Sequence, residues 1–233
     1  MITLFCFPFA GGDAASYNCF NAFAHAQVRI SPIELPGRGL RYSEEMSGDI
    51  QHMAADCLSQ VIAHLGGPFA FFGHSMGALL SYLAAKKMKE QKMPLPAHLF
   101  VSGCAGPRVL MTAARKRMPE KDELRKKMKE VMDIPASLID SEIFSMIYEP
   151  LIYADLAAFK QYRYEEQAPL DIPITVFTGL EDDVTIAEAR AWQRETTMNI
   201  EHLPFAGKHH FWKNYPEEIM NIIKQRTTAV IPR

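Results

Sequence analysis

The 233-residue chain lacks the features that mark several large classes of protein. Its four cysteines lie far apart, with no Cys-x-x-Cys pair and no metal-ligand spacing, so we expect core thiols rather than disulfides or a zinc site. The formal net charge is only −2, which gives no reason to expect nucleic-acid binding. No apolar run reaches the ~18 residues of a membrane span, and the N-terminus has no basic leader. We therefore expect a cytoplasmic protein with no contact to membrane or nucleic acid.

What the chain does contain is a regular alternation of short apolar runs and amphipathic segments. The hydrophobic content of 48% is enough for a full core in a domain of this size. We predict strands at residues 2–7, 28–33, 69–73, 97–102, 173–178 and 199–203, and helices at about 50–65, 76–92, 185–196 and 216–226. This order indicates a mostly parallel sheet with helices on both faces, in a single α/β domain over residues 1–233.

The pentapeptide Gly-His-Ser-Met-Gly at 73–77 carries the clearest chemical signal. It lies between an apolar run at 69–72 and a helical pattern at 78–85, so its serine falls on a sharp strand-to-helix turn. A side chain at either glycine position would crowd this turn. The turn would hold the Ser75 hydroxyl clear of the sheet, before a helix N-terminus that favours developing negative charge. This context predicts a nucleophilic serine rather than one that merely caps a helix.

A serine hydroxyl needs a base to take its proton, and an acid to orient that base. The predicted strand at 173–178 runs into a glycine turn that contains Asp182 and Asp183, and a later loop contains His209 and His210. Alone, these residues would read as turn formers and surface histidines. In the order serine, acid, histidine, each after a predicted strand, they favour a catalytic triad.

An acyl-transfer site also needs two backbone N–H groups that point at the developing oxyanion. One would come from Met76, the residue after the nucleophile. The other would come from the glycine-rich loop after the first strand, where Ala10 is the first choice and Phe9 the second. Pro8 has no N–H and is excluded. The alternative is an ordinary Gly-Gly turn.

Five motifs in this order resemble the type II (editing) thioesterases that accompany non-ribosomal peptide and polyketide synthases. They are Phe7–Gly12, Leu35–Gly39, Gly73–Gly77, Gly179–Asp183 and Gly207–Phe211, and the similarity extends from Leu4 to about Ile223. The animal medium-chain acyl thioesterase is similar to the same group.

The resemblance implies an α/β-hydrolase fold and a role for particular residues. It implies Ser75, Asp182 and His209 as the triad, because the family spacing Gly-x-x-Asp selects Asp182 over Asp183 and its Gly-x-His position selects His209 over His210. One residue departs from the pattern, since Lys208 stands where the family usually has a second glycine. That places a cation beside the expected base.

Residues 107 to about 165 interrupt the alternation, because they contain helical patterns and no strand signal. An all-helical insertion ahead of the acid predicts a lid over the active site. Its methionines would suit a pocket for varied acyl chains, although for any single one a place in the core of the insertion is the stronger expectation. They are Met111, Met118, Met128, Met132 and Met146.

Two basic clusters could dock an acidic carrier protein, or could simply be solvated helix faces. The first has nine cations against three acids in residues 108–129: Arg108, Arg115, Lys116, Arg117, Lys121, Arg125, Lys126, Lys127 and Lys129. The second comprises Lys86, Lys87, Lys89 and Lys92. We expect carrier-protein docking less from the second cluster than from the first.

The resemblance thus implies a thioesterase that releases acyl groups from the phosphopantetheine arm of carrier-protein domains. No cofactor or metal is expected, since phosphopantetheine belongs to the substrate, and we expect a monomer. Three other enzymes would use the same residues: a medium-chain acyl thioesterase acting on acyl-carrier or acyl-CoA substrates, a small-molecule carboxylesterase, and an acyltransferase. A non-catalytic binding module is less consistent with the sequence, because no triad member is missing.

Overall fold

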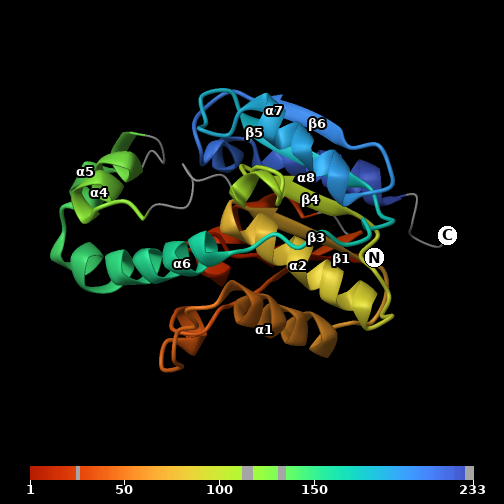
Figure 1. The fold of residues 1–233 in the computed structure, drawn as a ribbon, viewed down its shortest axis with the longest axis horizontal. Helices are drawn as coiled ribbons and strands as arrows, with labels where there is room; N and C mark the ends of the chain where they lie inside the picture. The colour runs from red at the N-terminus through yellow and green to blue at the C-terminus, as the bar shows by residue number, and fades with distance from the viewer. Residues whose placement is uncertain (25–26, 112–117, 131–134, 229–233) are drawn as a thin grey trace.

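The computed structural model describes residues 1–24, 27–111, 118–130 and 135–228. Six strands form one sheet in the order β2-β1-β3-β4-β5-β6, and every neighbouring pair is parallel (Figure 1). The strands are β1 (Ile2–Phe7), β2 (Val28–Pro32), β3 (Phe69–His74), β4 (Leu99–Ser102), β5 (Ile174–Gly179) and β6 (Glu201–Phe205). All six predicted strands are confirmed.

The helices follow the strands in the predicted alternation. They are α1 (Ile50–Ala63), α2 (Met76–Glu90), α4 (Lys121–Glu130), α5 (Ala136–Ile139), α6 (Glu149–Gln161), α7 (Ile186–Arg190) and α8 (Pro216–Thr227). Short 3₁₀ segments lie at Ala14–Phe23, Gly39–Arg41, Val109–Met111, Ala191–Glu195 and Phe211–Asn214, and a π turn at Phe144–Tyr148. The helix expected at 185–196 is therefore α7 followed by a 3₁₀ segment.

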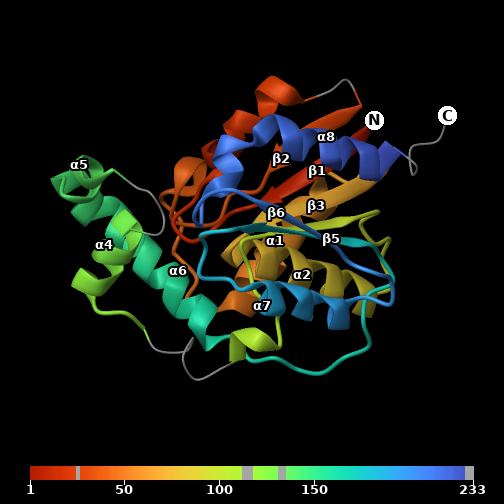
Figure 2. The ribbon, with the colours of Figure 1, turned by 90° about the horizontal axis from the view of Figure 1, so that it is seen from above.

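The sheet separates two hydrophobic cores, because successive side chains of a strand point to opposite faces. Phe5 and Phe71 pack with the helices α1 and α2, whereas Leu4 and Phe72 pack with α8. Figure 2 shows α8 and α2 on opposite sides of the strands. Within the described residues, each helix is too short or too polar to cross a bilayer.

The predicted apolar stripe of α1 is confirmed for most of its length. Asp49 caps the helix by accepting hydrogen bonds from two backbone N–H groups of the first turn. The buried residues are Ile50, Met53, Ala54, Cys57, Leu58 and Val61. Ile62 is exposed and the helix ends at Ala63 rather than at residue 65, although Leu65 still packs against the core. The two glycines that follow favour this early end.

The segment between β4 and β5 is helical throughout its described residues, as expected. α4, α5, the π turn and α6 form a small core of their own: Leu124, Met128, Ile139, Phe144 and Ile152. Both ribbon views show α4, α5 and the outer part of α6 projecting beyond the edge of the sheet (Figures 1 and 2). Ile143, Met146 and Ile147 are exposed.

Candidate active site

Ser75 lies on the sharp turn between β3 and α2. Its backbone has φ 53° and ψ −118°, a conformation that a non-glycine residue adopts only under strain. A Cβ at Gly77 would lie 2.2 Å from the Phe7 carbonyl oxygen, and one at Gly73 would lie 2.2 Å from the carbonyl oxygen of Gly77. Both glycines are thus required for the chain to pass this closely. The turn presents Ser75 at the carboxyl edge of the sheet.

The loops after β5 and β6 bring an aspartate and a histidine together at the same edge. His209 Nδ1 lies 3.0 Å from both carboxylate oxygens of Asp182, whose side chain is only 1% exposed. The loops can approach because Gly179 has no side chain: a Cβ there would lie 2.6 Å from the Gly207 carbonyl oxygen. This geometry fixes the His209 ring, with Nδ1 turned towards the carboxylate.

Asp183, the other candidate acid, points elsewhere. Its side chain is 53% exposed and forms an ion pair of 2.5 Å with Lys127 of α4. Of the two neighbouring carboxylates, the structure therefore pairs Asp182 with the histidine. Asp183 instead joins the acid loop to the helical segment.

His74, which precedes Ser75 in the chain, lies beside the ring of His209. The ring centroids of His74 and His209 are 4.8 Å apart. No hydrogen bond joins Ser75 and His209 in the described part of the chain, and such bonds often shorten only when substrate binds. The structure thus gathers the three predicted triad residues at one edge and bonds two of them directly.

Both predicted oxyanion-hole residues lie at this edge. Met76 is the first residue of α2, so its N–H has no acceptor within the helix. Ala10 lies in the turn after β1, where the next two N–H groups are already used: Gly11 donates to Asp155, and Gly12 donates to the Phe9 carbonyl. Ala10 also lines the neighbouring cavity.

Two further histidines lie beside the site, the buried His74 and the half-buried His210, and the pKa of each is lowered. His74 Nδ1 is hydrogen-bonded to Ser102 Oγ at 3.0 Å; burial, and then the charges of His209 and nearby cations, lower its pKa well below the ordinary value. Burial also lowers the pKa of His210 to about 2. The sequence did not single out His74, although it stands inside the serine motif. His210 packs against Phe9, with ring centroids 5.1 Å apart.

An apolar cavity of about 250 Å³ lies between the turn after β1 and the helical segment. The turn Phe9–Gly11 and His210 form one side. The other side comes from Met128, Leu138, Phe144, Tyr148 and Ile152. Of the five methionines proposed for a pocket, Met128 lines this cavity and Met146 is 76% exposed. The Met111 side chain and Met132 lie outside the described residues.

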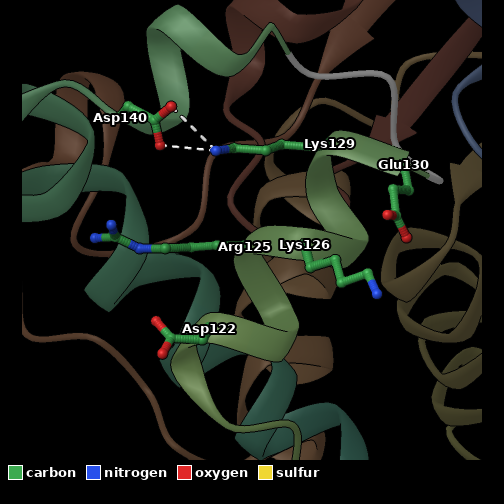
Figure 3. A pocket seen from close by; sticks show the side chains of 6 residues that line it. All are labelled: Asp122, Arg125, Lys126, Lys129, Glu130 and Asp140. Atoms are coloured by element: carbon green, nitrogen blue, oxygen red, sulfur yellow. Dashed lines mark hydrogen bonds and ion pairs between the residues drawn. The ribbon is translucent and has the colours of Figure 1, made fainter.

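The basic surface of α4 is largely engaged in ion pairs within the protein. Arg125 binds Glu149 of α6 through Nε at 2.6 Å and Nη2 at 2.9 Å, and Lys129 binds Asp140 at 2.8 Å. Figure 3 shows the side chains that line a pocket on this helical segment, three of them acidic and three basic: Asp122, Arg125, Lys126, Lys129, Glu130 and Asp140. Lys126 has no ion-pair partner among the described residues. Arg115, Lys116 and Arg117 of the same cluster lie outside them.

The second basic cluster is partly structural. The buried Lys86 donates to the Ala168 carbonyl at 2.7 Å, and Lys89 donates to that of Pro169 at 2.5 Å. These two lysines therefore tie the end of α2 to the chain that leads into β5. This agrees with the weaker docking expectation for this cluster.

The parallel sheet, the serine turn, and the acid and histidine loops that follow it in that order along the chain together define a class of protein. They are the features of a serine hydrolase with the α/β-hydrolase fold. Comparison with known proteins narrows the class. The thioesterase domain model matches residues 2–227, so the chain belongs to the thioesterase family.

Individual relatives cover almost the whole chain. It is 32% identical over 229 residues to the linear gramicidin dehydrogenase LgrE of Brevibacillus parabrevis, covering 96% of this chain and 86% of that one. It is 30% identical to the human medium-chain S-acyl fatty acid synthase thioesterase, covering 89% and 80%. Among solved structures, ClbQ from the colibactin NRPS/PKS pathway superposes with a TM-score of 0.88 at 26% identity, covering 98% of this chain and 97% of that one. The expected fold is confirmed.

Proposed function

We propose that this protein is a type II thioesterase, which hydrolyses acyl or aminoacyl thioesters on the phosphopantetheine arm of carrier-protein domains. In this role it would clear stalled groups from a non-ribosomal peptide or polyketide synthase. The observation that carries the proposal is the buried Asp182–His209 pair beside a strained serine turn, in a chain of the thioesterase family. The likeness to ClbQ, a protein of an NRPS/PKS pathway, supports the substrate class.

Each residue of the site has a definite chemical task. Ser75 Oγ attacks the thioester carbonyl while His209 Nε2 takes its proton, and the tetrahedral oxyanion forms. The N–H groups of Met76 and Ala10 hold that oxyanion. As the carbon–sulfur bond breaks, His209 returns the proton to the departing thiolate. Water, deprotonated by His209, then releases the acid from the Ser75 ester. Asp182 keeps Nδ1 protonated and stabilises the imidazolium.

The apolar cavity is the proposed acyl-binding pocket. It begins at Ala10, next to the proposed oxyanion site, and is lined mainly by apolar side chains. Its volume of about 250 Å³ lies below the ~300–1,000 Å³ of pockets that hold drug-sized ligands. A short acyl or aminoacyl group therefore fits this pocket better than a long fatty chain.

The helical segment 107–165 is the proposed lid, because α4, α5 and the π turn form one wall of that cavity. Lys126 and its exposed neighbours on α4 are the proposed contact for an acidic carrier protein. We further propose one domain over residues 1–233, acting as a monomer in the cytoplasm. The four free cysteines, three of them buried, suit a reducing compartment.

A medium-chain acyl thioesterase is the second candidate. The 30% identity with the human medium-chain enzyme favours it. A dehydrogenase, as the name of LgrE would suggest, is not proposed. The turn after β1 reads Pro-Phe-Ala-Gly-Gly, without the Gly-x-Gly-x-x-Gly pattern by which a dinucleotide pyrophosphate is usually held.

The test compares kcat/KM for the same acyl groups on carrier protein, on coenzyme A and as oxygen esters. Carrier-bound short acyl or aminoacyl groups should be the best substrates. A preference for medium-chain acyl-CoA would select the second candidate, and a preference for oxygen esters would select a carboxylesterase. Ser75→Ala should lower kcat by roughly 10⁴-fold or more and abolish labelling by a fluorophosphonate probe. Retained turnover in this variant would refute the serine mechanism.

A further inference from the structure

A buried ion pair joins two segments that are 117 residues apart. Arg38, from the motif at 35–39, binds Asp155 of α6 in bidentate fashion: Nη1 to Oδ2 at 2.6 Å and Nη2 to Oδ1 at 2.7 Å. The two side chains are only 3% and 2% exposed. A buried pair of this kind contributes little net stability, because desolvation offsets the attraction. Its contacts therefore need a further explanation.

Both side chains of the pair form hydrogen bonds to the backbone of the turn after β1. Asp155 Oδ2 accepts a hydrogen bond from the Gly11 N–H at 2.8 Å, and Arg38 Nη1 donates to the Gly12 carbonyl at 3.2 Å. The helix itself also lies on the turn, since a Cβ at Gly11 would be 2.2 Å from Ile152 Cγ1. The ion pair thus fixes the peptide groups on either side of the Gly11–Gly12 peptide, one through Asp155 of α6 and one through Arg38.

The geometry of the turn passes this constraint on to Ala10. Gly12 N–H donates to the Phe9 carbonyl at 2.8 Å, which closes a four-residue turn, and Gly11 in its third position has φ 76°, as a type II turn requires. The Phe9 carbonyl and the Ala10 N–H belong to the same planar peptide group. Holding the Phe9 carbonyl therefore sets the direction of the Ala10 N–H.

We propose that Asp155 and Arg38 are positioning residues of the oxyanion hole, which hold the turn so that the Ala10 N–H points at the reacting carbonyl. This inference rests on the proposed function and adds to it. Asp155 and Arg38 do not touch the substrate; they act through Gly11 and Gly12. The helical segment then contributes to the chemical step through α6, as well as to the acyl pocket.

The test replaces the pair by apolar side chains of similar volume, Arg38→Met with Asp155→Leu. Such replacements of buried ion pairs often leave stability unchanged, whereas changing one partner leaves a buried charge unpaired. A misdirected oxyanion donor should lower kcat by about 10²-fold, because the loss falls on the transition state. KM for a short acyl-pantetheine should change less than about threefold, since the pocket walls remain.

A second double variant, Arg38→Gln with Asp155→Asn, removes the charges but keeps an oxygen that can accept from Gly11. It should recover most of the lost kcat, to within about tenfold of wild type. For both variants, the affinity of an alkyl trifluoromethyl ketone, which forms a tetrahedral oxyanion on serine, should fall by the same factor as kcat/KM. If the apolar variant does not fold, the ketone affinity of the Gln/Asn variant decides the question.

Arg41→Met with Asp56→Leu is the matched control. Arg41 and Asp56 form another bidentate pair, at 2.6 and 2.9 Å, that does not contact the turn. This control should keep wild-type kcat and ketone affinity. Wild-type kcat in a folded Met/Leu variant, or a Gln/Asn variant whose kcat/KM falls while its ketone affinity stays unchanged, would overturn the positioning role. Turnover that survives Ser75→Ala would instead overturn the proposed function, so the two failures are distinguishable.

Discussion

Replacing the two neighbouring aspartates one at a time separates the proposed acid from its neighbour. Asp182→Asn keeps the shape of the side chain but removes the charge beside His209. Asp183→Asn makes the same chemical change one residue further on, where the side chain is exposed and paired with Lys127. The second variant is therefore a close control for the first.

The structure sets the size of the expected effect. His209 Nδ1 lies 3.0 Å from both Asp182 oxygens, and the carboxylate is almost fully buried. At an effective dielectric of about 20, a charge pair 3–4 Å apart interacts by roughly 4–5 kcal/mol. Loss of that stabilisation for the imidazolium corresponds to a fall in kcat of roughly 10³- to 10⁴-fold. Asp183→Asn removes only an exposed ion pair, worth about 0–1 kcal/mol of stability, and should leave kcat within about twofold.

The assay follows thiol release from a short acyl-pantetheine at saturating substrate, with thermal unfolding measured in parallel. Asp182→Asn should remain folded, because asparagine fills the same space. Its KM should change little, since Asp182 is not one of the residues that line the acyl pocket. Undiminished kcat in Asp182→Asn, or a large loss in Asp183→Asn, would show that the acid has been assigned to the wrong residue.

Three further predictions concern the pocket, His210 and the docking surface. Phe144→Ala should enlarge the acyl cavity and raise kcat/KM for longer chains several-fold relative to short ones, while costing about 3–5 kcal/mol of stability. Burial lowers the pKa of His210 to about 2, so the unfolded state binds more protons below pH ~6.5 and stability should fall as the pH drops from there. His210→Phe should show a smaller loss of melting temperature between pH 7 and 5; an equal loss would exclude this cause. Lys126→Glu should raise KM for an acyl-carrier substrate about two- to fivefold and leave KM for acyl-pantetheine unchanged, and equal effects on both would place the charge in lid structure instead.

The sheet and the site loops could be predicted because their signals are local. Apolar runs marked all six strands, and glycines 73 and 77 marked a turn that only they can form. Parallel strands then bring their carboxyl ends to one edge, which explains why residues as distant as Asp182 and His209 meet. The apolar runs and the glycine turns together were enough to predict the sheet and the loops of the site.

Contacts between distant side chains could not be predicted in the same way. Nothing local to Arg38 or Asp155 indicates their pairing, since each lies in a segment with its own regular pattern. The same holds for Lys127, which was grouped with surface cations but binds Asp183. Met146 shows the converse error: it was predicted to line a pocket or to lie in the core of the insertion, yet it is exposed.

Two unlike ion pairs among the described residues join the helical segment to the rest of the protein. Arg38–Asp155 is buried and shielded from solvent, whereas Lys127–Asp183 is about half exposed. Salt at physiological concentration screens exposed charges over about 8 Å but acts much less on buried pairs. A rise in ionic strength should therefore weaken the attachment of α4, which forms part of one wall of the acyl cavity. The contact between α6 and the turn after β1 should not change. Admission of substrate and alignment of the reacting groups would then respond separately to the surrounding solution.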